Sequence, residues 1–239
     1  MRQGLGILGG MGPLASAEFV KTIYEYNLTS REQEMPRCIL YSDPSIPDRT
    51  EAIQQNRTDM VVNQLQHALT QLAHQDVARI VMTCITAHYF LPQIHPELRA
   101  QMLSLIDIIL DTVVSAQAPH LMFCTNGTRK AQIFQRAPRW PEAARFIILP
   151  AEDDQNSIHA LLYRVKQADT GPERLADVEQ LLAKYRVQGL IAGCTEMHLL
   201  TKQLATRGRY QIADPLLTIA QTLPQLLAGN VRERVVGTV

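Results

Sequence analysis

The sequence predicts an α/β fold built from two pseudo-symmetric lobes, each with a mostly parallel sheet flanked by helices. Short apolar runs alternate with longer amphipathic stretches along the chain, which is the pattern of strands connected by helices in a parallel sheet. The two halves also resemble each other, because a strand, a turn and a later strand that ends at a cysteine occur in both. We interpret this repeat as an ancient duplication.

The elements can be assigned in chain order. Strands are expected at the apolar runs 3–9, 37–42, 78–83, 120–125, 145–149, 188–193 and 210–213. Helical spacing of apolar residues is clearest at 59–73 and 156–168, and further helices are expected at 13–27, 97–116, 173–185 and 215–228. Pro13 suits a first helical turn because its missing N–H would be unpaired there in any case. Asp214, which precedes Pro215, is the expected N-cap of the last helix.

The repeat also gives the expected domain boundaries. At 239 residues the chain is long enough for one large domain or two of about 120 residues. Residues 1–105 are expected to form the first lobe and 106–214 the second, with 215–239 returning to complete the first. Open α/β sheets bind ligands beyond the carboxyl ends of their strands. Two such lobes that face each other would therefore place the functional site in the cleft between them.

The composition argues against several classes of protein. The 23 Lys and Arg residues balance 23 Asp and Glu residues, so no basic surplus is available for nucleic acid. The segment MRQGLGILGG has no charged region ahead of an apolar signal-peptide core, and no run of about 18 apolar residues could span a bilayer. We therefore expect a cytoplasmic protein without nucleic-acid or membrane partners. Four cysteines are too few for a disulfide scaffold, so a functional cysteine would be a reactive thiol or a metal ligand.

Cys84 and Cys194 occupy matching places in the two halves. Each closes an apolar run, and each is followed four residues later by a histidine, His88 or His198. The polar residues after each cysteine can begin a helix, whose N–H groups and dipole lower a thiol pKa from about 8.5. Inversion of a carbon centre requires one group that removes a proton and an opposed group that delivers one. The sequence therefore predicts a pair of acid/base thiols.

Other interpretations of these residues remain open. Cys-x-x-x-His occurs twice and supplies four ligands of the type that zinc accepts. The two cysteines could also be small buried hydrophobes at strand ends. His88 and His198 are expected to pack and hydrogen-bond, with support of a thiolate as the alternative. Cys38 and Cys124 are expected to be buried core residues.

Seven short motifs follow one another along the chain. They are GILGGMGPLAS at 6–16, PDRT at 47–50, CITAH at 84–88, TNGT at 125–128, YRVK at 163–166, GCTE at 193–196 and ADP at 213–215. In this order and at these intervals they resemble the aspartate/glutamate racemase family, enzymes that use two cysteines and no cofactor. The resemblance covers nearly the whole chain. It implies two flavodoxin-like lobes with the active site between them, and neither pyridoxal phosphate nor a metal.

The resemblance also implies roles for individual residues. Cys84 and Cys194 would be the acid/base groups, one on each face of the α-carbon. Arg49 and Lys166 would bind the distal carboxylate of an acidic amino acid, arginine through two parallel N–H bonds and lysine as a point charge. Glu196 would tune or relay the Cys194 proton, or merely suit the first turn of a helix. Turn N–H groups would hold the α-carboxylate. The remaining substrate-binding candidates are Met11, Ile85, Thr86, Ala87, Thr125, Asn126, Thr128 and Thr195.

One position departs from the pattern of the family. At residues 84–88 the family usually has Cys-Asn-Thr-Ala-His, and this chain has Ile85 in place of the asparagine. Isoleucine removes a hydrogen-bond donor and an acceptor that asparagine would offer to a substrate. Asn126, on the matching turn of the other half, is expected to supply a polar contact in its place.

The predicted function is a cofactor-independent isomerase that interconverts the L- and D-forms of aspartate or glutamate. The alternatives are an isomerase of a small unsaturated diacid on the same scaffold and a non-catalytic binder of an acidic metabolite. The expected partners are the small amino-acid substrate and, as an open alternative, a second copy of the chain.

Overall fold

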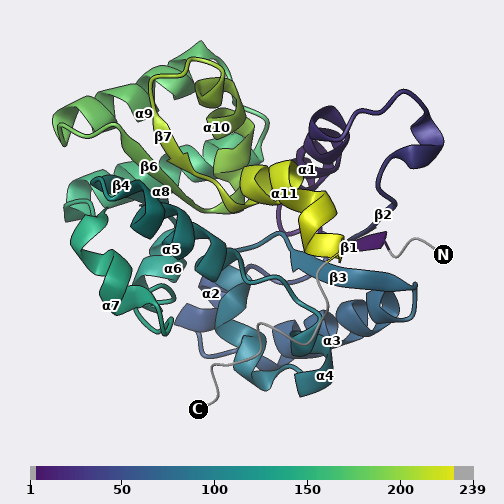
Figure 1. Cartoon of the computed structure of the whole chain (residues 1–239). Coiled ribbons are helices and arrows are strands. Elements are labelled where there is room, and N and C mark those ends of the chain that lie inside the picture. The colour runs from purple at the N-terminus through teal and green to yellow at the C-terminus, as the bar shows by residue number, and fades with distance from the viewer. Residues whose placement is uncertain (1–3, 229–239) are drawn as a thin grey trace.

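The computed structural model describes residues 4–228, which form two parallel sheets flanked by helices (Figure 1). The first sheet has three strands in the order β2-β1-β3, and the second has four in the order β5-β4-β6-β7. Every pair of neighbouring strands is parallel. The predicted α/β fold is therefore confirmed. None of the described helices is long and apolar enough to cross a membrane.

The first sheet consists of β1 (Gly4–Gly9), β2 (Cys38–Ser42) and β3 (Val77–Met82). Its two faces are covered by different helices, because successive side chains of a strand point to opposite sides. Leu5 and Ile7 of β1 pack with Phe19 of α1 (Pro13–Tyr26). Leu8 points to the other face and packs with Leu65 of α3 (Asp59–Ala73). The short η1 (Glu32–Glu34) and α2 (Arg49–Gln54) lie in the loops around β2.

The second sheet consists of β4 (His120–Cys124), β5 (Ile147–Ile148), β6 (Gly189–Gly193) and β7 (Gln211–Ala213). Leu121 and Leu190 pack on one face against α8 (Glu152–Lys166), α9 (Pro172–Lys184) and α10 (His198–Ala205). Met122 and Ile191 point to the opposite face, toward α5 (Leu105–Ala116).

A single hydrophobic cluster, which we call the shared core, joins the two halves. It contains side chains from both sheets and from α5 and α11 (Pro215–Ala228), including Leu5, Ile7, Ile109, Met122, Ile191 and Ile219. The last helix, α11, packs against α1 and α5 near the centre of the molecule (Figure 1). These contacts join α11 to α1 of the first predicted lobe and to α5 of the second, so the return of 215–228 to the first lobe stays a prediction. Residues 229–239 of that prediction lie outside the described residues, and the division at residue 105 stays a prediction.

The single helix predicted at 97–116 is wrong. The structure has two helices there, α4 (Pro96–Ala100) and α5, separated by four residues that run beside β3. Ile80 of β3 donates a backbone hydrogen bond to Gln101 and accepts one from Leu103, at 2.9 and 2.8 Å. These bonds replace the helical ones at this point. Ser104 then caps α5, because its hydroxyl accepts the Asp107 N–H.

Helix starts were expected after both cysteines, and η2 (Thr86–Gln93), η4 (Thr195–Met197) and α10 lie there. Other short helices were not predicted: η1, α2, α6 (Asn126–Lys130), α7 (Trp140–Ala143) and η3 (Ala144–Phe146). All of these short helices have eight residues or fewer, too few for a clear apolar period. Four of them, η2, α6, η4 and α10, follow the carboxyl ends of β3, β4 and β6, where the motifs lie.

Candidate active site

The segments that carry the two cysteines lie side by side. Cys84 follows β3 and precedes η2, and Cys194 follows β6 and precedes η4. Both cysteines are 5% exposed. The hydroxyl of Thr195 donates a hydrogen bond of 3.0 Å to the carbonyl of Thr83. The residue after one cysteine is thus bonded directly to the residue before the other.

Cys194 is held by a carboxylate. Its thiol donates a hydrogen bond of 2.7 Å to Oε2 of Glu196, which is 2% exposed. Burial raises the pKa of Cys194 well above its usual range, the charge of Glu196 raises it further, and Lys166 opposes the shift. The predicted lowering of this pKa is therefore wrong in the ligand-free site. Burial and a neighbouring carboxylate outweigh the dipole of the helical segment that begins at Thr195 with η4 and continues into α10.

Glu196 lies against the turn that follows β1. A Cβ atom placed on Gly12 would stand 2.2 Å from Oε1 of Glu196, so the Glu196 carboxylate occupies the space that the absence of a side chain at Gly12 leaves open. Oε1 is buried, and no group in residues 4–228 hydrogen-bonds to it. The carboxylate from the second half is therefore enclosed by the Gly-rich turn of the first, with one oxygen free to accept a proton or a hydrogen bond.

Arg49 is anchored to the first half. It is 7% exposed, and its Nη1 donates to the carbonyls of Ile46 and Pro47, both at 3.0 Å. Its Nη2 donates to the carbonyl of Met11 at 2.9 Å. A guanidinium has five N–H donors, so these three bonds leave the Nε–H and one N–H on Nη2. Nε is buried and has no partner among the described residues.

The charge of Arg49 faces Cys84. Burial alone would lower the pKa of Arg49, yet negative charge on Cys84 and Asp48 raises it overall. Arg49 can therefore stabilise a thiolate at Cys84 while its free N–H groups bind an anion.

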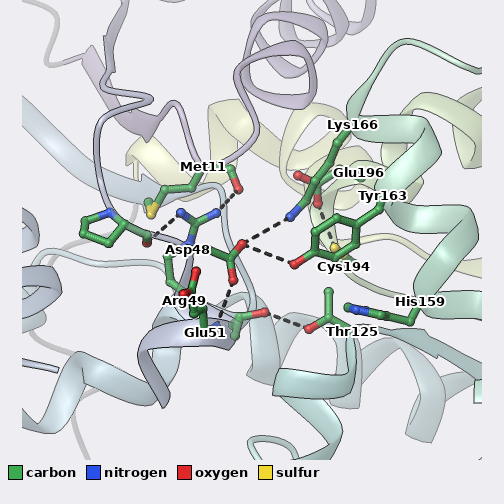
Figure 2. A network of polar contacts seen from close by, with 12 residues as sticks. Met11, Asp48, Arg49, Glu51, Thr125, His159, Tyr163, Lys166, Cys194 and Glu196 are labelled. Carbon is green, nitrogen blue, oxygen red and sulfur yellow. Dashed lines mark hydrogen bonds and ion pairs between the residues drawn. The ribbon is translucent and has the colours of Figure 1, made fainter. Parts of the chain in front are cut away.

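Lys166 connects the two thiols. It extends from the end of α8 into the space between the halves (Figure 2). Burial alone would lower the pKa of Lys166, but negative charge on Cys194, Glu196, Tyr163 and Cys84 raises it overall. One ammonium group thus lies within electrostatic reach of both cysteines, which places the two thiols at a single site.

Asp48 and Tyr163 belong to the site but were not among the predicted site residues. Oδ2 of Asp48 accepts a 3.2 Å hydrogen bond from the Tyr163 hydroxyl and lies 4.0 Å from Nζ of Lys166. Its Oδ1 accepts the Glu51 N–H at 3.0 Å and so caps α2. Both residues stand inside quoted motifs. The spacing of Asp48 and Glu51, an N-cap residue followed three positions later by glutamate, is a signal that could have found α2.

Three threonine hydroxyls meet across the halves. Thr86 Oγ1 lies 3.1 Å from Thr125 Oγ1 and 2.9 Å from Thr128 Oγ1, and the last two are 3.1 Å apart. Thr125 also caps α6 by accepting the Thr128 N–H. Beside them α2 approaches α6 closely, because a Cβ on Gly127 would stand 2.5 Å from Thr50 Oγ1. The two candidate turns at 85–87 and 125–128 are thus brought into direct contact.

Ile85, Ala87 and Asn126 have different surroundings. Ile85 is 1% exposed and packs in the shared core, and Ala87 is fully buried. Asn126 is half-buried, and its side chain accepts a hydrogen bond from Gln155 and donates one to Asn156. An isoleucine at 85 is therefore in an apolar environment, and the amide of Asn126 is paired toward α8.

His159 is a further residue that the sequence did not single out. Its Nδ1 accepts the Asn126 N–H at 3.4 Å, and its ring stands 4.6 Å from the Tyr163 ring, centre to centre. Burial lowers the pKa of His159, and the charge of Lys166 adds to this effect. His159, Tyr163 and Lys166 share one face of α8 that points toward the first half (Figure 2).

The two histidines that follow the cysteines, His88 and His198, hydrogen-bond to neighbouring parts of the protein. His88 Nδ1 lies 2.9 Å from the carbonyl of Cys84. His198 is fully buried, and its ring nitrogens bond to Asp214 at 2.7 Å and Thr22 at 2.9 Å. Zinc bound by both Cys-x-x-x-His pairs would need these nitrogens, and no cluster of three or more His, Cys, Asp or Glu side chains within residues 4–228 could hold a metal.

The other two cysteines lie away from the thiol pair. Cys124 is 2% exposed, and burial raises its pKa to about 12. Cys38 is half-buried rather than buried, and desolvation raises its pKa to about 11.

Comparisons with known proteins agree with this architecture. Residues 8–223 match the family described as Asp/Glu/Hydantoin racemase. The aspartate racemase of Picrophilus torridus is 25% identical, with 95% of each chain covered and a TM-score of 0.81. PH1733, an aspartate racemase homologue from Pyrococcus horikoshii, is 20% identical over 96% of this chain and 100% of that one, with a TM-score of 0.73. A glutamate racemase from Campylobacter jejuni has the same fold at 17% identity, with 97% and 89% covered and a TM-score of 0.62.

Proposed function

The chain belongs to the Asp/Glu/hydantoin racemase family, and from this premise we propose that it interconverts the L- and D-forms of aspartate or glutamate, with Cys84 and Cys194 as the acid/base groups. Membership of the family indicates an isomerase that acts on amino acids or hydantoins. The observation that carries the narrower proposal is the position of Lys166, a half-buried cation within electrostatic reach of both thiols. A second cation, Arg49, lies beside Cys84.

The two thiols differ in their surroundings, and this difference suggests which thiol removes a proton from the substrate and which delivers one. A thiolate at Cys84, stabilised by the guanidinium of Arg49, would remove the α-proton from one face of the substrate. Cys194 retains its proton because burial and Glu196 raise its pKa, so it would deliver a proton to the opposite face. Cys84 would then carry the proton and Cys194 the negative charge, which lies near Lys166. Glu196 would accept the Cys194 proton for the reverse direction.

Substrate binding would use the free donors of the same groups. The distal carboxylate would accept the two unused N–H groups of Arg49 and pair with the ammonium of Lys166. The α-carboxylate would lie at the turns 85–87 and 125–128 and near Thr195, where η2, α6 and η4 begin, because helix N-termini attract anions. Glu196 and Met11 would complete the wall on the side of the Gly-rich turn. This arrangement favours dicarboxylic amino acids over neutral ones.

Deuterium exchange tests the function directly. Incubation of the protein with L-aspartate or L-glutamate in heavy water is expected to replace the α-proton by deuterium, seen by NMR, and to bring the optical rotation to zero. A two-base enzyme must incorporate solvent deuterium into the product enantiomer because the proton arrives from a different group. Absence of exchange with both amino acids would contradict the proposed function. Exchange of a 5-substituted hydantoin alone would show that the substrate is a hydantoin rather than an acidic amino acid.

The role of Glu196 predicts a shift in the titration of Cys194. Burial and then the charge of Glu196 raise the Cys194 pKa, so Glu196→Gln, which removes that neighbouring charge, is expected to lower this pKa. The measurement is the pH dependence of Cys194 alkylation by iodoacetamide, followed by peptide mass spectrometry in a Cys84→Ser background. Glu51→Gln, an exposed glutamate on α2, is the control. An unchanged or raised midpoint in Glu196→Gln would rule out this role.

A further inference from the structure

Asp48 is bound on two sides at once. Its Oδ1 caps α2 through the Glu51 N–H, a contact within the first half. Its Oδ2 reaches α8 of the second half, where it accepts the Tyr163 hydroxyl and faces the Lys166 ammonium. Figure 2 shows the carboxylate between Arg49 on one side and Lys166 with Tyr163 on the other. A carboxylate of the protein itself thus occupies the place between the two cations.

The contact between Asp48 and Lys166 is loose. Nζ and Oδ2 are 4.0 Å apart, whereas a charge-assisted hydrogen bond between an ammonium and a carboxylate is about 2.7 to 2.9 Å long. The ammonium also lies over the Tyr163 ring, 4.2 Å from Nζ to the ring centre, and within electrostatic reach of Cys194 and Glu196. No hydrogen bond from Nζ of Lys166 is present within the described part of the chain. The cation is therefore only partly satisfied and can gain a closer anion.

The Asp48 side chain can release Lys166 without loss of the helix cap. The cap uses Oδ1, and only the two contacts of Oδ2 would have to break. If Asp48 stayed in place beside a bound dicarboxylate, two carboxylates would share the ammonium, and like charges at such a separation repel. An exchange of one carboxylate for the other avoids this repulsion.

We infer that Asp48 is an internal substitute for the distal carboxylate of the substrate: it holds Lys166 and Tyr163 in the ligand-free site, and a dicarboxylic amino acid displaces it from Lys166. This inference rests on the proposed function. Asp48 is then a specificity-determining residue, because a neutral amino acid has no group that can replace it. The Asp48 contacts weaken the binding of every dicarboxylate and leave a neutral amino acid unaffected.

Asp48→Asn tests this inference. Asparagine caps helices as well as aspartate does, so α2 is kept while the charge is removed. Succinate, an unreactive dicarboxylate, is expected to bind the variant about fivefold more tightly than the unaltered protein in calorimetry, the effect of one partly exposed ion pair. The KM for L-aspartate in the exchange assay is expected to fall by a similar factor. If Asp48 merely held Lys166 in position for substrate, the dissociation constant of succinate and the KM for L-aspartate would both rise instead.

Two further variants sharpen the test. Tyr163→Phe removes the hydroxyl contact of Asp48 and keeps its charge, so a smaller tightening in the same direction is expected. Asp59→Asn removes the same charge from an exposed position on α3 and is expected to leave succinate binding unchanged. Succinate binding to Asp48→Asn that is no tighter than to the unaltered protein overturns the inference. Failure of the proposed function appears separately, as absence of deuterium exchange in the unaltered protein.

Discussion

Replacement of either thiol by a hydroxyl is expected to abolish racemisation while leaving half of the chemistry. Cys84→Ser and Cys194→Ser should each lower racemisation on the order of a thousandfold, the contribution of a positioned acid or base. A serine hydroxyl is a far weaker acid than a thiol and cannot serve as the base on its face. Each variant should nevertheless exchange the α-proton of one enantiomer, because the remaining thiol still reaches one face of the substrate.

The measurement uses the pure L- and D-forms separately in heavy water, with exchange followed by NMR and racemisation by chiral chromatography. The two variants are expected to retain opposite enantiomers. Cys38→Ser, at a half-buried position on β2, is the matched control and should retain both. Retention of the same enantiomer by both thiol variants, or unchanged racemisation in either, would contradict the two-base assignment.

The largest loss of stability is expected for Asp214→Ala. Asp214 is 1% exposed, and its Oδ1 accepts the N–H groups of Leu216 and Leu217 at the start of α11. Its Oδ2 accepts the Thr201 hydroxyl and pairs with His198. Removal of the carboxylate leaves buried donors unpaired and removes a helix cap, which together cost about 3 to 5 kcal/mol. Urea denaturation followed by circular dichroism measures the change in the free energy of unfolding.

The pH dependence of stability follows from the same carboxylate. Burial alone would raise the pKa of Asp214, but the neighbouring His198 and the hydrogen bonds to Asp214 lower it overall. A carboxylate whose pKa is lower in the folded state stabilises the protein above its ordinary pKa, and this contribution disappears as the pH falls through the folded value.

Asp214→Asn keeps the cap and serves as the control for Asp214→Ala, with a smaller expected loss of stability. A loss below about 1 kcal/mol for Asp214→Ala would show that the network contributes little.

The framework could be predicted from the sequence because its signals are local. Each of the seven predicted strands overlaps an observed one, and the predicted helix 215–228 coincides with α11. Asp214 caps that helix as expected. Apolar runs, proline at a first helical turn and a capping aspartate act over a few residues, so the sequence shows them directly. The exception is 97–116, where Ile80 donates a backbone hydrogen bond to residue 101 and accepts one from residue 103, and these bonds replace the helical ones.

The sequence predicted which residues form the candidate site better than it predicted the pKa values of those residues. The motifs singled out Cys84, Cys194, Arg49 and Lys166; Arg49 lies within electrostatic reach of Cys84, and Lys166 within reach of both cysteines. The direction of the Cys194 pKa shift was wrong because it depends on burial and on how Glu196 packs against the turn of the other half. Asp48 was missed for a related reason. Its partner on α8 is more than a hundred residues away in sequence, since Tyr163 and Asp48 are 115 residues apart.

The trio formed by Thr86, Thr125 and Thr128 leaves the direction of only two hydrogen bonds open. Thr125 donates to Thr128, but in the two contacts of Thr86 either oxygen can be the donor. The Thr86 hydrogen can therefore turn toward either neighbour while the heavy atoms stay in place. Mirror-image ligands present their polar groups to one wall in different orders. A hydroxyl that changes direction by rotation alone lets a wall of one rigid shape receive both hands of a molecule.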